Sequence, residues 1–288
     1  MAERALGLWM TLAAAVLFGV AAVAAADVFI LVAPTRVAQF RSVMAALVLG
    51  AVALHRGRIH PRGQLLKLIL LGANLAAVTV TFYWAIERLG VGPGTTIQFT
   101  APVLVLAWMR LAENRFVPAV GWAAAATAVA GTALMTRAWD ASLDTVGVLA
   151  GVGAAVTFAS YLVLGERLGA VLPSLTVIAY GFAISAFIWL VAVPPAVADL
   201  TAGAWWRLIF IGLAGTAVPF LLEVSALRRA DPGSVGVVAT AEPVVGAAFA
   251  WVVLGQVLTP IQVVGGLLTA VSVAAIHLFT SRRSTWPG

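Results

Sequence analysis

Two stretches decide the fold: AIERLGVGPGTTIQFTAPVLVLAWM, from Ala85 to Met109, and SALRRADPGSVGVVATAEPVVGAAFAW, from Ser225 to Trp251. Each begins at the end of one apolar run, passes through a Gly/Pro turn and enters the next run. Each also carries a proline near its centre, Pro102 in the first stretch and Pro243 in the second. This likeness predicts that the chain contains an internal repeat.

The likeness extends in both directions from these stretches. Downstream, Phe116-Val117-Pro118 resembles Leu258-Thr259-Pro260, and each tripeptide opens the last apolar run of its half. Upstream, LFG at Leu17–Gly19 matches TFA at Thr157–Ala159, at almost the same separation along the chain as the two prolines. Because order and spacing agree along the chain, we predict two related halves, residues 1–138 and 139–288.

The composition indicates a membrane protein. Hydrophobic residues make up 62% of the 288 residues and charged residues only 10%, whereas a soluble domain carries about 25% charged residues. No cysteine is present, which excludes disulfides and thiolate chemistry. The formal charge of +6 comes from Lys and Arg residues that lie between apolar runs and form no basic face. This distribution favours a role in orienting the chain in the membrane over nucleic-acid binding.

A helix that spans the bilayer needs about 20 mainly apolar residues, and the sequence offers ten such runs. The first run has no charged residue between Ala5 and Ala26. This uncharged stretch is longer than the apolar segment of a signal peptide, about 7–15 residues, so we interpret the run as a retained helix. The predicted spans are 6–26, 36–54, 66–87, 93–112, 117–136, 145–166, 173–193, 206–228, 233–254 and 260–280.

Five helices per half is an odd number, so the second half must enter the membrane from the opposite side. The predicted fold class is therefore an all-α integral membrane protein of ten transmembrane helices in two inverted-topology repeats, an architecture common among secondary transporters. With the loop HRGRIHPRGQLLK in the cytoplasm, twelve Lys and Arg lie on that face and five on the other. The positive-inside rule then predicts a cell-membrane protein with both termini cytoplasmic.

These features resemble the drug/metabolite transporter superfamily, in its EamA-type ten-helix branch. The resemblance covers the whole chain and is carried by the segments around Pro102 and Pro243. This chain has Glu242-Pro243 but Gly255-Gln256 where the family often has a second glutamate. Within the superfamily it is similar to YddG-like amino acid exporters. The resemblance implies alternating access around a central cavity between the halves, lined mainly by helices 1, 3, 4, 6, 8 and 9, and no ATP hydrolysis by the chain.

Polar, acidic and aromatic residues inside apolar runs are the candidates for solute binding. Ionisable groups within hydrocarbon cost several kcal/mol and commonly face a cavity or a partner. An amino acid needs donors for its carboxylate and an acceptor or a ring face for its ammonium. For each aromatic, a place at the membrane interface is the alternative. The predicted substrate-binding residues are Tyr83, Trp84, Gln98, Phe99, Phe158, Tyr161, Glu223 and Glu242.

Four further expectations concern the placement of individual residues. The separation that pairs Leu17 with Thr157 also pairs Tyr83 with Glu223, which places both near the axis that relates the halves. Pro102 and Pro243 fall inside predicted helices, where each removes a backbone hydrogen bond, and we interpret them as gating bends. Arg41 lies near the outer start of the second helix, and we expect its side chain to extend to the headgroups. Close helix contacts are expected at Gly121, Gly131, Gly265 and Gly266.

Signatures of other functions are missing from the sequence. There is no Walker A lysine motif and no nucleophile–base–acid set. His55, His60 and His277 do not form a metal cluster with other ligands. We therefore expect a transporter, not an enzyme, with no cofactor or metal. Its expected partners are a small-molecule substrate, an aromatic amino acid above others, and the bilayer. An exporter of cationic drugs or other metabolites, proton coupling, a lipid enzyme and a channel remain alternatives.

Overall fold

The computed structural model describes residues 2–29, 31–89, 91–140, 144–194, 201–255 and 257–282, and within them every regular element is a helix. The first half holds α1 (Ala2–Phe29), α2 (Pro34–His55), α3 (Leu65–Leu89), α4 (Val91–Gln98), α5 (Ala101–Leu111), α6 (Ala119–Thr136) and the 3₁₀ turn η1 (Ala138–Asp140). The second half holds α7 (Thr145–Gly169), α8 (Ser174–Ala192), α9 (Ala202–Gly212), the π-helical segment η2 (Leu213–Ala217), α10 (Val218–Leu227), α11 (Pro232–Ala239), α12 (Ala241–Leu254) and α13 (Pro260–Arg282).

The ten predicted membrane spans are present. In the described residues, nine segments are long and apolar enough to cross a bilayer. The tenth, predicted as one helix over 93–112, is instead divided into α4 and α5 at Phe99–Thr100, so neither piece reaches about 20 residues alone. The predicted spans 206–228 and 233–254 are also interrupted, by η2 and at Thr240.

The packing of the helices repeats between the two halves. Helix α3 packs on α7, and its counterpart pair, α1 against α9 and α10, packs in the same way. Helices α4 and α5 contact α7 as α11 and α12 contact α1. The two remaining pairs, α2 with α8 and α6 with α13, join equivalent helices. Exchanging the halves therefore reproduces the contact pattern.

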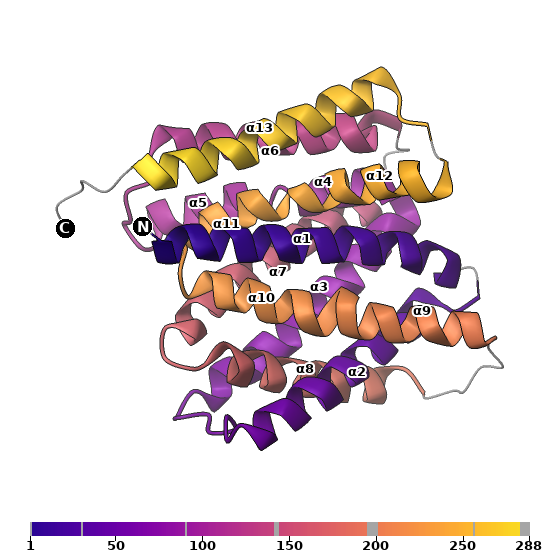
Figure 1. Ribbon diagram of the computed structural model, residues 1–288, viewed down its shortest axis with the longest axis vertical. Helices are drawn as coiled ribbons and strands as arrows, with labels where there is room; N and C mark the ends of the chain where they lie inside the picture. Colours follow the sequence, from indigo (N-terminus) through magenta and orange to yellow (C-terminus); the bar gives the residue numbers. More distant parts are fainter. Residues whose placement is uncertain are drawn as a thin grey trace.

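The start of α1 and the end of α13 lie at the same end of the bundle (Figure 1). That placement fits five spans in each half, with the second half inverted. The prediction of ten helices in two inverted repeats is confirmed.

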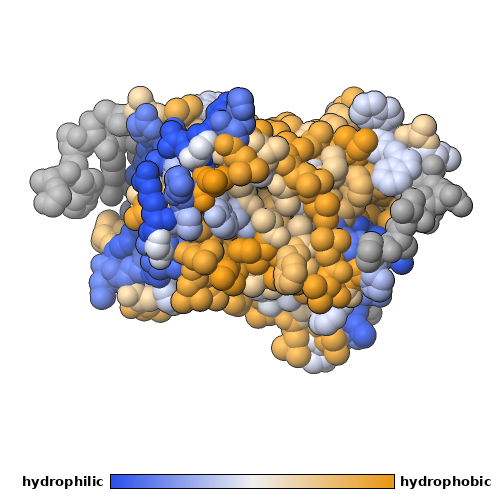
Figure 2. All heavy atoms as spheres, turned by 90° about the horizontal axis from the view of Figure 1, so that it is seen from below, coloured by the Kyte–Doolittle hydropathy of each residue, from blue (hydrophilic) through white to orange (hydrophobic). Residues whose placement is uncertain are grey.

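The surface suits a protein surrounded by lipid. Figure 2 shows an apolar band between two hydrophilic ends. Large apolar side chains lie exposed on the helices, among them Leu66, Val191 and Val252, each at least 70% exposed. Exposed apolar area of this extent marks an interaction with a membrane or a partner, and here it lies on membrane-length helices.

Ion pairs tie the connections at the end of the bundle where the chain starts. The loop between α5 and α6 carries Glu113 and Arg115, which bind Arg167 at 2.7 Å and Glu166 at 3.0 Å on α7. Arg4 binds Asp231, the residue that caps α11. Desolvation raises the pKa of Glu113, but hydrogen bonds from Arg167, Trp108 and Arg115 outweigh it and hold this pKa below its ordinary value of 4.5.

Candidate functional site

A cavity of about 130 Å³ lies among the central turns of the bundle. Its lining comes from the first, third, fourth, sixth, eighth and ninth membrane spans, as the family resemblance implied; in the helix labels these are α1, α3, α4, α7, α10, α11 and α12. The second span, α2, contributes as well. The lining residues are Thr11, Ala15, Phe18, Arg41, Val78, Thr79, Phe82, Tyr83, Gln98, Phe99, Phe158, Tyr161, Phe220, Glu223, Ala239 and Glu242. Both halves of the chain therefore build one site.

Seven of the eight predicted binding residues line this cavity. They are Tyr83, Gln98, Phe99, Phe158, Tyr161, Glu223 and Glu242. Tyr83 and Glu223, which the repeat pairs with each other, do bring their side chains to one cavity. One pair of equivalent positions of the two repeats thus lines the same cavity.

Trp84 is a correction to the predicted set, because the structure does not place it in the lining. Its side chain is 54% exposed. Consecutive residues on an α-helix with 3.6 residues per turn point about 100° apart, so α3 cannot turn both Tyr83 and Trp84 inward. The tertiary packing of α3 on α7 and α8 selects Tyr83.

Two acidic side chains converge on the cavity. Glu223 lies on α10 and is only 2% exposed, and Glu242 lies in the first turn of α12. The hydroxyl of Tyr161 lies within electrostatic range of Glu223. Neither this hydroxyl nor Oε2 of Glu223 has a partner in hydrogen-bond geometry within the described structure. Tyr161 and Glu223 interact with each other, and both keep hydrogen-bonding capacity that a polar solute could use.

Arg41 is a cavity residue that the sequence interpretation misses. The expectation that its side chain extends to the headgroups is wrong, because it lines the cavity from α2 and interacts electrostatically with Glu242. Helix α2 packs against α9 and η2, and its Arg41 Cα lies 3.9 Å from where a Cβ on Gly212 would stand. A charged residue inside an apolar run is the feature of the sequence that could have identified Arg41 as a cavity residue. Whether its side chain points into the cavity or toward the headgroups depends on how α2 is rotated about its axis.

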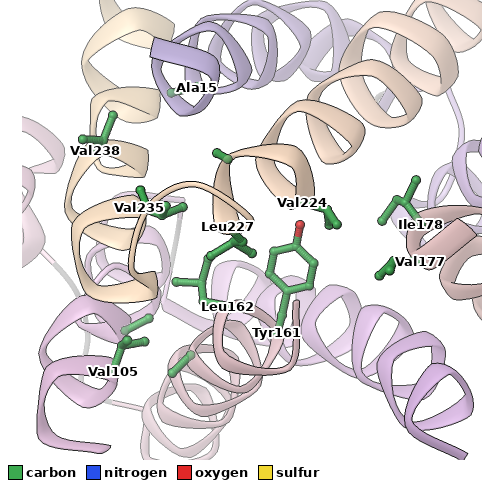
Figure 3. Packing of buried hydrophobic residues seen from close by; sticks show 14 of the residues in the cluster. Ala15, Val105, Tyr161, Leu162, Val177, Ile178, Val224, Leu227, Val235 and Val238 are labelled. Carbon is green, nitrogen blue, oxygen red and sulfur yellow. The ribbon is translucent and has the colours of Figure 1, made fainter. Parts of the chain in front are cut away.

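Aromatic rings form one wall of the cavity. Phe158 and Tyr161 are stacked on α7 with centroids 6.2 Å apart. Phe220 meets Tyr161 edge-to-face at 5.6 Å and Phe18 at 5.0 Å. In Figure 3, the Tyr161 side chain extends from α7 toward Val224 on α10, with Leu227 nearby. Such contacts, at 4.5–7 Å between centroids, are favourable for aromatic pairs, so the wall is preassembled.

Two of the interrupted spans, 93–112 and 233–254, place matched polar groups beside the cavity. Thr100 follows α4 and Thr240 follows α11, so the two threonines occupy equivalent positions of the repeat. Each threonine hydroxyl donates to the carbonyl three residues earlier, Thr100 to Ile97 at 2.7 Å and Thr240 to Val237 at 2.6 Å.

Pro102 and Pro243 follow these breaks by two and three residues. Each proline removes the N–H that would have bonded the carbonyl four residues earlier, which explains where the helices end. The structure therefore accounts for bends at both prolines, while a gating role for them stays a prediction.

One protein-family model matches both halves of the sequence. The EamA-like transporter family model matches residues 5–137 and again residues 145–278. These segments fall on either side of the predicted division at residue 138, which itself stays a prediction.

Individual proteins are similar over most of the chain. The threonine/homoserine exporter RhtA of Escherichia coli K12 is 31% identical over 220 residues, 74% of this chain and 71% of that protein. An uncharacterized inner membrane transporter, YicL of Salmonella typhimurium, is 26% identical over 226 residues, 75% of this chain and 74% of that protein. One solved crystal structure superposes with a TM-score of 0.81 at 18% identity, covering 97% of this chain and 99% of that chain. At that identity the superposition shows the fold alone.

Proposed function

Because this chain belongs to the EamA-like transporter family, we propose that it exports small amino acids, bound as zwitterions in the central cavity. The chain is a multi-pass membrane transporter and not an enzyme. The observation that carries the proposal is the joint presence of Arg41, Glu223 and Glu242 in one lining. A guanidinium can bind a carboxylate, and a carboxylate can bind an ammonium.

The mixed charge of the lining argues against the main alternative, an exporter of cationic drugs. A cation would meet Glu223 and Glu242 favourably, but it would also lie close to Arg41. Like charges within a partly desolvated cavity repel strongly because the local dielectric is low. A zwitterion satisfies both signs at once. Gln98 and the Tyr161 hydroxyl add neutral hydrogen-bonding groups to the same lining.

The size of the cavity favours a small side chain. Pockets for drug-sized ligands measure about 300–1,000 Å³, whereas this cavity measures about 130 Å³. The names of the RhtA relatives also support a small hydroxylated amino acid. An aromatic amino acid is the second candidate, since Phe158, Tyr161 and Phe220 offer ring faces on which another ring can stack; it would require this wall to open.

Alternating access follows from the repeat. Two inverted halves that meet at one cavity can expose it to either side by rocking about it, and the divided helices beside Thr100 and Thr240 offer places to bend. We place both termini in the cytoplasm, because the end of the bundle that holds the start of α1 carries more Lys and Arg than the opposite end. The relatives' names support export as the direction.

Counterflow in proteoliposomes tests the substrate class. Vesicles that contain the purified chain are loaded with one unlabelled solute and diluted into labelled threonine, homoserine, phenylalanine, tryptophan or a quaternary amine. We expect saturable exchange of threonine and homoserine. Exchange of the quaternary amine without any amino acid would refute the proposal, and exchange of phenylalanine or tryptophan alone would favour the second candidate.

Proton coupling is tested at Glu242. If this carboxyl takes up a proton in the transport cycle, Glu242→Gln should abolish the stimulation of flux by an imposed pH gradient while leaving exchange between equal solute pools measurable. Unchanged net flux with an unchanged pH dependence would remove Glu242 from coupling. Glu223→Gln is the matched variant, since Glu223 lines the same cavity from α10.

A further inference from the structure

Four arginines line a second pocket, of about 720 Å³, at the end of the bundle where the chain starts. Arg56, Arg58 and Arg62 belong to the connection between α2 and α3, and Arg228 follows the end of α10. The rest of the lining is apolar and comes from the turn between α7 and α8, Ala170–Pro173, and from Leu175. This pocket shares no lining residue with the central cavity.

The arginine-bearing connection is held in a defined shape. The backbone N–H of Arg58 donates to the carbonyl of Ala53 at 2.7 Å, which ties the start of the connection to the last turn of α2. From α8, the Thr176 hydroxyl donates to the Arg58 carbonyl and the Tyr180 hydroxyl to the Ile59 carbonyl, both at 2.8 Å. Gly57 has φ +61°, a left-handed conformation that suits glycine. These contacts fix the backbone from which the arginines project.

The positive charge of this pocket has no counter-charge among the residues that the structure describes. The lining contains no acidic residue, and the sequence from residue 28 to residue 86 contains neither Asp nor Glu. Within the described ranges, none of the four arginines forms an ion pair. Arg228 donates through Nη1 to the Leu172 carbonyl at 2.9 Å, which positions its guanidinium at the pocket while leaving its other N–H groups available.

The surroundings of the pocket are those of a lipid surface. Leu54 and Leu66 on the two helices that flank the connection are 64% and 70% exposed, and Val171 in the lining is 49% exposed. The pocket therefore combines four basic side chains with exposed apolar neighbours. Basic pockets between membrane helices on the cytoplasmic side bind anionic lipid headgroups, and arginine binds phosphate oxygens bidentately.

We infer that this pocket binds the phosphate headgroup of an anionic phospholipid, with Arg56, Arg58, Arg62 and Arg228 as the phosphate ligands and the flanking leucines against the acyl chains. The ordinary role of loop arginines, orientation of the chain in the membrane, requires only their number on one face. It does not require that Arg228 join the three arginines of the α2–α3 connection in one pocket. The inference stands on this convergence and does not depend on the proposed transport function.

The test uses the full chain in phosphatidylcholine nanodiscs with increasing phosphatidylglycerol, and it follows Tm as the readout of binding. The double variant Arg56→Gln/Arg58→Gln removes two side-chain charges and keeps the backbone bonds of the connection. The matched control, Lys67→Gln/Arg110→Gln, removes two charges at positions that do not line the pocket. Each lost arginine removes a charge-assisted bond to phosphate worth about tenfold or more in affinity, so the Tm rise with phosphatidylglycerol should be lost in the pocket variant and largely retained in the control.

Three further arms decide the outcome. Inorganic phosphate and glycerol phosphate, added to nanodiscs of phosphatidylcholine alone, should leave Tm within error; a full Tm rise with either would overturn the assignment to a lipid. Arg56→Lys/Arg58→Lys should give a phosphatidylglycerol response between those of the unsubstituted chain and the Gln variant, because the charge is retained while the bidentate hydrogen bonds are lost. A Lys variant as weak as the Gln variant, or a control double variant as weak as the pocket variant, would also overturn the inference.

Discussion

Gly265 offers a quantitative test of how closely the two last helices of the repeats approach. A methyl group on this residue of α13 would press on the Met135 backbone N and stand 2.6 Å from the Gly131 carbonyl oxygen of α6. Ordinary contact for a Cβ begins near 3.4 Å, so the two helices must separate by something on the order of 1 Å to relieve the overpacking. A gap of about 0.5–1 Å removes a quarter to a half of each dispersion contact, and overpacking of this kind costs about 1–3 kcal/mol.

Gly266 is the matched control, because it is the next residue of the same helix. A methyl group there would lie 3.5 Å from Met135 Sδ and 3.6 Å from Val244 Cγ1, which is ordinary contact. The intrinsic gain of about 0.8–1.0 kcal/mol for Ala over Gly in a helix applies to both variants and cancels between them. The difference between Gly265→Ala and Gly266→Ala therefore isolates the clash.

The measurement is thermal unfolding of both variants in the same detergent. At about 2–4 °C for each kcal/mol, a difference of about 1–3 kcal/mol lowers the Tm of Gly265→Ala by about 2–12 °C relative to Gly266→Ala. Equal Tm values for the two variants would show that α6 and α13 do not approach through Gly131 and Gly265. Of the four glycines at which close helix contacts were expected, the structure confirms Gly131 and Gly265. A Cβ on Gly121 or Gly266 would make only ordinary contacts, at 3.6 and 3.5 Å.

Three other perturbations follow from named contacts. Arg41→Gln removes the guanidinium from the cavity, and with about 1.5–3 kcal/mol for a hydrogen bond to a charged group, KM for threonine counterflow should rise by about 10- to 150-fold; Lys67→Gln is the control, and an unchanged KM would remove Arg41 from substrate binding. Because the folded-state pKa of Glu113 is lowered, its stabilisation is present above about pH 4.5 and lost as the pH falls through the lowered pKa; Tm should therefore fall less on acidification to about pH 3.5 in Glu113→Gln than in the unsubstituted chain, and equal falls would contradict the ion-pair assignment. Thr240→Val loses the buried hydroxyl bond to Val237 and should lower stability by about 0.5–1.5 kcal/mol; Thr240→Ser, which keeps the hydroxyl, should restore most of it in the same melting experiment, and a Ser variant as unstable as Val would argue against this bond.

Part of the candidate site could be predicted from the sequence, namely the residues that the internal repeat or a polar position in an apolar run singles out. The constant separation between matching positions pairs Tyr83 with Glu223, and both reach the cavity. Polar or charged residues within apolar runs identify Gln98, Glu223 and Glu242. The same signal is present for Arg41, but the sequence does not specify whether a side chain near the end of a helix extends outward or inward.

The sequence by itself determined the number of membrane spans, their arrangement as a repeat and the prolines, Pro102 and Pro243, at which two of them bend; the division of these spans into separate helices came from the structure. These depend on local properties: the length of an apolar run must match the bilayer, and a proline in the interior of a helical run removes a backbone bond. Only the tertiary structure decided that Arg41 enters the cavity, that Trp84 leaves it, and that Arg228 shares one pocket with Arg56, Arg58 and Arg62. The physical reason is that an apolar run of nearly uniform hydrophobicity leaves the rotation of its helix undetermined, and the packing of helices distant in the chain then fixes which face turns inward.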